Sequence, residues 1–168
     1  MRLGCSVDVL RIAKALPMLS AMSEGVRPRA AELGRRVARA LEARPEVLEA
    51  YVFGSVARGE AQPHSDVDVA VYLDRSRCTR EGFGPAAELT AELMRALGTN
   101  RVEVAILNDA SPLLYHRVLR DGIRIVSRDL AASTTREGQA LSRYCDYVPQ
   151  LAKVDAARKQ ARARAARS

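Results

Sequence analysis

Residues 51–73 constrain the fold of this chain more than any other stretch. An apolar run ends at Gly54-Ser55, a short loop follows, and a second apolar run begins with Asp66 and Asp68. Alternate residues of a strand point to the same face, so the two aspartates are expected side by side. The opposite face would carry only apolar side chains, namely Val67, Val69, Val71 and Leu73. The sequence therefore predicts two strands and paired carboxylates at the start of the second.

Two neighbouring carboxylates repel each other unless they share a cation. Mg²⁺ is a common solution, because protein carboxylates bind it together with the phosphates of a substrate. Gly54 permits a close approach of the backbone to such a substrate, and Ser55 adds a hydroxyl and an N–H group. The alternative is a hairpin-like connection with an acidic turn.

The residue pattern of this stretch resembles a known signature. Gly54-Ser55, ten further residues and then Asp66-x-Asp68 resemble the nucleotidyltransferases with a polymerase-β-like fold. Phe-Gly-Ser-x-Ala-Arg-Gly and Ser-Asp-Val-Asp are similar to the minimal nucleotidyltransferases, small domains often paired as antitoxin with a HEPN toxin. The resemblance covers roughly residues 47–126, and more loosely the arm around Tyr144-x-Asp146-Tyr147.

The resemblance implies a set of site residues. Asp66 and Asp68 would bind two Mg²⁺ ions, and Glu103 would supply the third carboxylate, where the family usually has Asp. The residues that would bind the nucleotide are Gly54, Ser55, Arg58 and Ser65. Alternatively, Glu103 is a solvated residue at a strand edge and Arg58 a surface arginine. Asp74 and Asp109 are reserve candidates for the third carboxylate, and the small Ala70 and Ala105 are expected to leave space for the nucleotide.

The motif does not identify the acceptor of the nucleotidyl group. The minimal nucleotidyltransferases transfer AMP from ATP to a tyrosine of a HEPN ribonuclease toxin, so the resemblance implies an adenylyltransferase antitoxin with a HEPN-type partner. Two alternatives remain open. One is transfer to a small molecule such as an aminoglycoside, and the other is a non-catalytic antitoxin that acts by binding.

The remaining pattern predicts an α/β fold, a polymerase-β-like nucleotidyltransferase fold with a small mixed sheet flanked by helices. We expect an N-terminal extension over residues 1–27, partly disordered, a nucleotidyltransferase domain over 28–130, and a C-terminal helical arm with a basic tail over 131–168. Helices are expected at 29–44, 54–59, 85–97 and 112–120, and strands at 47–53, 67–73, 101–107 and 123–126. Thr134 and Glu137 fit a capping box for the arm, and Pro149 is expected to kink or divide it.

Charge is concentrated at the C-terminus. Of the net charge of +7, residues 153–168 contribute +5, which leaves +2 for the rest of the chain. The tail has no aromatic residues for base stacking, so nucleic-acid binding is not favoured. The cysteines Cys5, Cys78 and Cys145 show no metal or disulfide spacing, and His64 and His116 are isolated. Without an apolar run long enough to span a membrane, we expect a cytoplasmic protein that does not bind membranes.

Overall fold

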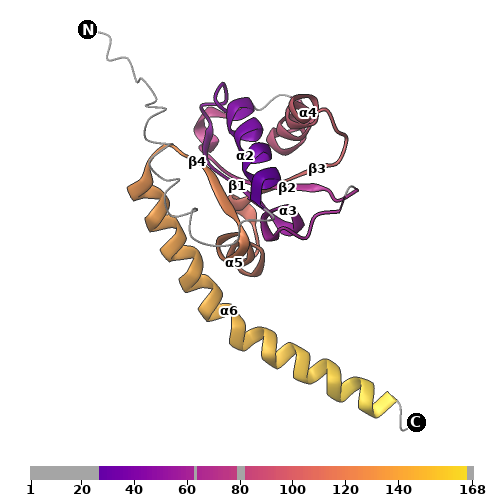
Figure 1. Ribbon diagram of the computed structural model, residues 1–168. Coiled ribbons are helices and arrows are strands. Elements are labelled where there is room, and N and C mark those ends of the chain that lie inside the picture. Colours follow the sequence, from indigo (N-terminus) through magenta and orange to yellow (C-terminus); the bar gives the residue numbers. More distant parts are fainter. Residues whose placement is uncertain (1–26, 63, 79–81, 166–168) are drawn as a thin grey trace.

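A computed structural model of the chain describes residues 27–62, 64–78 and 82–165. Its centre is one sheet with the strand order β3-β2-β1-β4 (Figure 1). β1 is antiparallel to both β2 and β4, and β2 is parallel to β3. The four strands are β1 (Val47–Phe53), β2 (Val67–Leu73), β3 (Val102–Ile106) and β4 (Ile123–Ser127). The sheet is mixed, as predicted.

Helices surround the sheet and connect its strands. A short helix α3 joins β1 to the loop before β2, and α4 makes the crossover between the parallel strands β2 and β3. Two short 3-10 turns follow β2 and β3. The bounds are α2 (Arg27–Leu41), α3 (Gly54–Arg58), η2 (Arg75–Arg77), α4 (Pro85–Leu97), η3 (Leu107–Asp109), α5 (Pro112–Asp121) and α6 (Leu130–Ala165).

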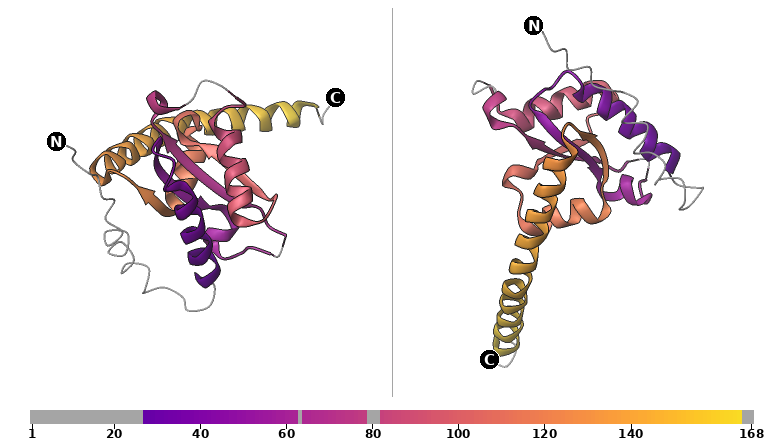
Figure 2. Two further views of the ribbon diagram at one scale, coloured as in Figure 1. Left: turned by 90° about the horizontal axis from the view of Figure 1, so that it is seen from above. Right: turned by 90° about the vertical axis from the view of Figure 1, so that its left-hand side faces the viewer.

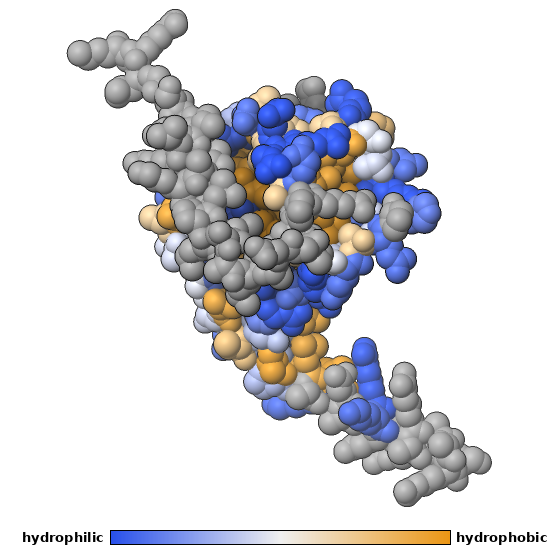
Figure 3. Space-filling model, in the orientation of Figure 1, coloured by the Kyte–Doolittle hydropathy of each residue, from blue (hydrophilic) through white to orange (hydrophobic). Residues whose placement is uncertain are grey.

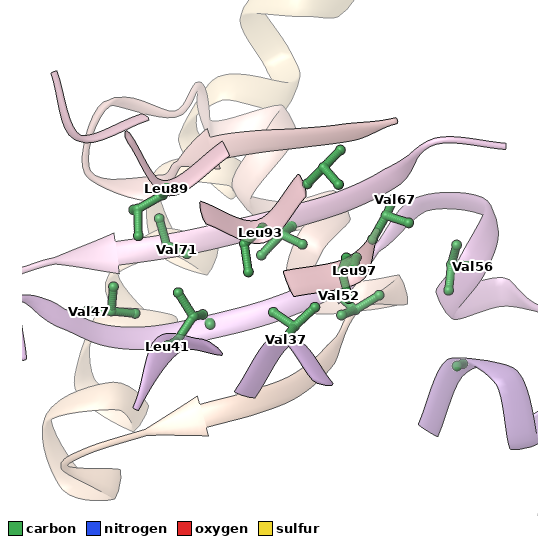
Figure 4. Close-up of a cluster of buried hydrophobic side chains, with 14 of the residues drawn as sticks. Val37, Leu41, Val47, Val52, Val56, Val67, Val71, Leu89, Leu93 and Leu97 are labelled. Carbon is green, nitrogen blue, oxygen red and sulfur yellow. The ribbon is translucent and has the colours of Figure 1, made fainter. Parts of the chain in front are cut away.

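The larger hydrophobic core lies between one face of the sheet and the helices α2 and α4 (Figure 4). Apolar residues one turn apart form the buried side of each helix, and alternate residues of β1 and β2 meet them. Val37 and Leu41 come from α2, and Leu89 and Leu93 come from α4; all four are fully buried. The side of β2 opposite Asp68 therefore faces this core, as the alternation predicted.

The other face of the sheet carries a second, smaller cluster. Tyr51 and Phe53 of β1 pack there with Ala70 of β2, under Tyr115 and Val118 of α5 and Ala140 of α6. Ala70 is fully buried. The expectation that Ala70 leaves space for a nucleotide is therefore wrong, because α5 and α6 fill the space above it.

The C-terminal helix α6 starts beside β4, crosses α5 and extends away from the domain (Figures 1 and 2). The capping box at Thr134 is wrong, because α6 begins four residues earlier and Thr134 donates a hydrogen bond to the carbonyl of Leu130. Asp129 caps the helix instead and accepts from the N–H of Ala132 at 3.1 Å. Pro149 lies inside α6 and does not divide it.

Buried polar contacts fasten the first turns of α6 to the sheet. Arg136 forms an ion pair with Glu49 of β1, whose side chain is fully buried. The hydroxyl of Tyr51 lies 2.9 Å from a carboxylate oxygen of Glu49 and 2.9 Å from one of Glu137. Further along, His116 and Tyr144 stack with their ring centroids 3.7 Å apart, which gives the isolated histidine a structural role.

Beyond these contacts α6 is mostly exposed. Its apolar side chains Leu141, Val148 and Val154 are 44%, 41% and 47% exposed, and Figure 3 shows apolar surface where the helix leaves the domain. Residues 1–26 of the predicted N-terminal extension, Cys5 among them, lie outside the described residues, as do the last three residues of the basic tail. Within residues 27–165, leaving aside the two undescribed stretches, no helix combines the length and apolarity needed to cross a bilayer.

Candidate active site

The site is built around the contact between Gly54 and Asp68. Gly54 is the first residue of α3 and has a φ of +70°, a conformation that side chains other than glycine rarely adopt. A Cβ atom at this position would lie 1.9 Å from a carboxylate oxygen of Asp68. The carboxylate therefore lies directly against the Gly54 backbone, and any larger residue would displace it.

Glu103 is the partner of Asp68 on the neighbouring strand. The two residues are in register in the parallel β2–β3 pair, so their side chains share the face that also carries Phe53. Glu103 is exposed on β3, which is an edge strand of the sheet. Asp66 lies just before β2 and is exposed as well. The fold thus brings Asp68 and Glu103 together on one sheet face, with Asp66 just before β2 at the same end of the sheet.

The electrostatics of Asp68 reflect this crowding. Burial, followed by the negative charges of Glu103 and Asp66, raises the pKa of the Asp68 carboxyl above its ordinary value, and the positive charge of Arg58 opposes the shift. Like charges disfavour ionisation of a carboxyl, and a nearby cation restores it. A divalent cation at this place would relieve the repulsion.

These carboxylates fit a metal that brings part of its own ligand set. In the described residues, no group of three His, Cys, Asp or Glu side chains is arranged to hold a metal ion by itself. Mg²⁺ usually binds through one or two protein carboxylates and completes its shell with phosphate oxygens and water. The residues that could hold it here are Asp68 and its neighbours Asp66 and Glu103.

The predicted nucleotide-binding residues surround the same point. α3 begins immediately after β1, and no side chain caps its N-terminus. Ser55 lies in its first turn, and the backbone of Gly59 closes the helix in the left-handed conformation. Arg58 forms a 2.8 Å ion pair with Glu60 and is 40% exposed. Free backbone N–H groups and an exposed guanidinium are suited to an anionic ligand.

The loop before β2 holds Asp66 in place. The Ser65 hydroxyl accepts a hydrogen bond from the N–H of Gln62 at 2.9 Å, so its oxygen is used within the loop. His64 is exposed, and its carbonyl accepts from Arg101 at 2.6 Å. No sequence pattern predicts this supporting role of Arg101, because a basic residue just before a strand has many other uses.

The reserve candidates Asp74 and Asp109 lie elsewhere. They follow the last residues of β2 and β3, whereas Asp68 and Glu103 lie near the first residues of these strands. Asp74 accepts hydrogen bonds from Ser76 and forms an ion pair with Arg77, and Asp109 pairs with Arg75. The structure therefore excludes both from the carboxylate cluster.

Comparison with known proteins adds independent findings. The family model described as "Polymerase beta, Nucleotidyltransferase" matches residues 35–131, more than half of the chain. A search of curated proteins gives no match.

Solved structures share the fold. A chain of a toxin–antitoxin complex with AMP-PNP superimposes with a TM-score of 0.62 and 23% identity, covering 74% of this chain and 97% of that one. A chain from the complex of a tri-AMPylated Shewanella oneidensis HEPN toxin with an MNT antitoxin has a TM-score of 0.59 and 21% identity. The match covers 76% of this chain and 98% of that one. A chain from the toxin–antitoxin complex MntA-HepT has a TM-score of 0.55 and 20% identity, and the match covers 76% of this chain and 97% of that one.

The matched segment contains the whole sheet, Gly54-Ser55 and all three carboxylates of the site. The chain belongs to the polymerase beta nucleotidyltransferase family.

Proposed function

We propose that this protein is an adenylyltransferase antitoxin that transfers AMP from ATP to a tyrosine of a HEPN-family ribonuclease toxin. The observation that carries the proposal is the carboxylate of Asp68 against the backbone of Gly54, in register with Glu103. The family match supports the reaction class. Among the proteins with this fold, one complex contains AMP-PNP and another an AMPylated HEPN toxin bound to its antitoxin, which supports the choice of nucleotide and acceptor.

In this proposal each residue has a defined task. The backbone at Gly54 and the hydroxyl of Ser55 bind the β- and γ-phosphates, and Arg58 offsets the charge of the departing pyrophosphate. Asp66 and Asp68 would hold Mg²⁺, and Glu103 would contribute a carboxylate to it on the side of the acceptor. Two Mg²⁺ ions would supply the positive charge that activates the acceptor hydroxyl and stabilises the leaving group.

The acceptor hydroxyl must reach the phosphorus from outside the domain. The sheet face beyond Asp68 is closed by the buried cluster around Ala70, so it offers no room for an acceptor there. Asp66 and Glu103 are exposed, and a tyrosine presented by a second protein could approach from their side. This arrangement leaves the site accessible to a protein acceptor.

The experiment is to incubate the protein and its co-purified HEPN partner with ATP and Mg²⁺ and to measure the intact mass of the partner. We expect a gain of one or more AMP units with the wild type and none with Asp68→Asn. Asp109→Asn is the matched control and should transfer normally, because that aspartate lies at the other end of β3. Tight binding without a mass gain would instead establish a non-catalytic antitoxin, and labelling of an aminoglycoside would establish a small-molecule transferase.

A further inference from the structure

The outer edge of β3 is open in the part of the chain that the structure describes. β3 is the last strand of the sheet on the side of Glu103, and among the described residues it makes extended contact only with β2 and α4 (Figure 1). In the opposite edge strand β4, side chains bond to α6, as in the ion pair of Arg124 with Glu137. The sheet is therefore open on the side of the carboxylates.

The backbone of β3 directs hydrogen-bonding groups to this open edge. The N–H of Val67 donates to the carbonyl of Arg101 at 3.0 Å, which fixes the phase of the parallel pairing between β2 and β3. Alternate residues of a strand bond to opposite sides, so the N–H groups of Val102, Val104 and Ile106 point away from β2. No hydrogen bond within the described residues uses them. Such a row of free N–H groups is a template for one more strand.

The side chains along this edge are only partly covered. Val104 and Ile106 of β3 and Met94 of α4 border the larger core and remain half-buried. On the other face of the sheet, Glu103 is exposed and the small Ala105 is half-buried. An added strand places its alternate side chains on these same two faces. One set would cover the apolar border, and the other set would lie beside Glu103.

The position of this edge relative to the carboxylates indicates what pairs with it. Of the two edges of the sheet, only that of β3 adjoins the strand that carries Asp68. Further along β2 on the same face, Ala70 is fully buried beneath α5 and α6, so that approach is closed. The molecule that reacts at the carboxylates therefore reaches them past β3.

We propose that an extended segment of the acceptor protein pairs with the open edge of β3 and thereby presents its tyrosine to the carboxylates. This inference rests on the proposed function. A tyrosine opposite Glu103 or Ala105 has its side chain on the face of Asp68, and its backbone lies one strand spacing of about 4.8 Å from β3. Backbone hydrogen bonds bind the segment, and the face on which a side chain lies selects the tyrosine that reacts.

The first experiment measures amide hydrogen exchange residue by residue by NMR, in the free protein and in its complex with the HEPN partner. The N–H groups of Val104 and Ile106 should exchange quickly in the free protein and at least about tenfold more slowly in the complex. Those of Glu103 and Ala105 bond to β2 in both states and are internal controls. Protection in the free protein that rises with its concentration would assign the edge to a second copy and overturn the proposal.

A matched pair of variants separates the backbone of β3 from its side chain. Val104→Pro removes an outward N–H and is compatible with the fold, since proline is tolerated in an edge strand where that group faces solvent. At saturating ATP it should raise the KM for the partner about tenfold or more, because strand pairing is blocked. Val104→Ala keeps the N–H, and its KM should stay close to the wild-type value. Both variants should bind ATP with Mg²⁺ like the wild type.

Failure of this pairing and failure of the proposed function give different results. If the wild type transfers AMP but Val104→Pro has a normal KM, or the N–H of Val104 stays unprotected in the complex, edge pairing is overturned and the proposed function stands. Protection of β3 without AMP transfer supports the pairing with the partner and overturns the proposed function. A partner that does not bind at all overturns both.

Discussion

At the scale of single residues, position 54 and position 68 depend on each other. Gly54 combines a positive φ with the close approach of the Asp68 carboxylate, and each feature alone disfavours a side chain there. The signature that combines Gly54-Ser55 with the two aspartates predicted that they belong to one site. What the spacing did not predict is which atoms touch.

Gly54→Ala tests that contact. The new methyl group must displace the Asp68 carboxylate, so we expect nucleotidyl transfer to be lost and the free energy of unfolding to fall by about 1–3 kcal/mol. Gly98→Ala is the control, since Gly98 has a φ of +65° but no atom within 4 Å of a new Cβ. It should cost about 1 kcal/mol and leave transfer unchanged. Equal effects of both variants on transfer would disprove the special role of Gly54.

Glu103 is tested by changing its charge and its length separately. Glu103→Gln keeps the shape and removes the negative charge, so most transfer activity should disappear. Glu103→Asp restores the residue usual in the family and should keep or raise activity. Steady-state rates with saturating ATP and Mg²⁺ provide the measurement. If the Gln variant is as active as the wild type, Glu103 is the solvated edge residue that its exposure also permits.

The raised pKa of Asp68 has a consequence for stability. The folded state binds this proton more tightly than the unfolded chain, so protonation stabilises the fold. That stabilisation is fully present below the unfolded pKa and is lost as the pH rises through the folded pKa. In EDTA at pH 7, Asp68→Asn should therefore be more stable than the wild type, by less than about 1 kcal/mol because the carboxyl is only half-buried.

Denaturant unfolding of both proteins across the pH range measures this difference. It should shrink towards pH values below about 4, where the aspartate of the wild type is also protonated. An Asn variant that is less stable than the wild type at pH 7 would contradict the electrostatic description of the site.

At the scale of elements, short apolar runs made the strands predictable and local competition made the helix ends less so. β1 and β2 have the predicted bounds, since each is a run of seven mostly buried residues. The start of α6 differs from the prediction because Asp129 offers a cap before Thr134 does. Glu137, assigned to the capping box, is instead used by Tyr51 and Arg124, and no local pattern could reveal those partners.

Arg128 directly follows β4 and contacts the end of α2, the turn after it and the start of β1. Its guanidinium donates to the carbonyls of Leu41, Arg44 and Val47, so it connects the end of α2 to the start of β1. Arg128→Ala should lower the free energy of unfolding by about 1–3 kcal/mol. Arg120→Ala, which loses a pair between an exposed guanidinium and Asp121, should lower it much less. Chemical denaturation of both variants distinguishes the two cases, and equal losses would refute the bridging role.

At the scale of the whole molecule, the continuous helix α6 has two parts. Its first part packs against the sheet and α5, and its last part extends away from the domain. Removing residues 153–168 should change the free energy of unfolding by less than about 0.5 kcal/mol, because the side chains described there are exposed. Removing residues 141–168 should cost more, since the stack of Tyr144 on His116 adds about 0.5–1.5 kcal/mol. Equal stability of the two truncations would show that the anchored part ends before Tyr144.

The strands, the family and the aspartate pair could be predicted from the sequence, because their signals lie within short stretches of the chain. Glu103, in contrast, was assigned only through the family resemblance. The buried cluster over Ala70 could not be predicted in the same way. It is formed where α5 and α6 cover the sheet, and contacts between residues distant in sequence decide that geometry.

We infer that the carboxylates beside Gly54 bind a metal-bound nucleotide, whatever the acceptor. Calorimetric titration of the protein with ATP, in the presence of Mg²⁺ and again in EDTA, measures this binding. We expect saturable binding that requires Mg²⁺ and is lost in Asp68→Asn but kept in Asp109→Asn. Equally tight ATP binding by wild type and Asp68→Asn, or binding unaffected by EDTA, would rule out this role of the carboxylates.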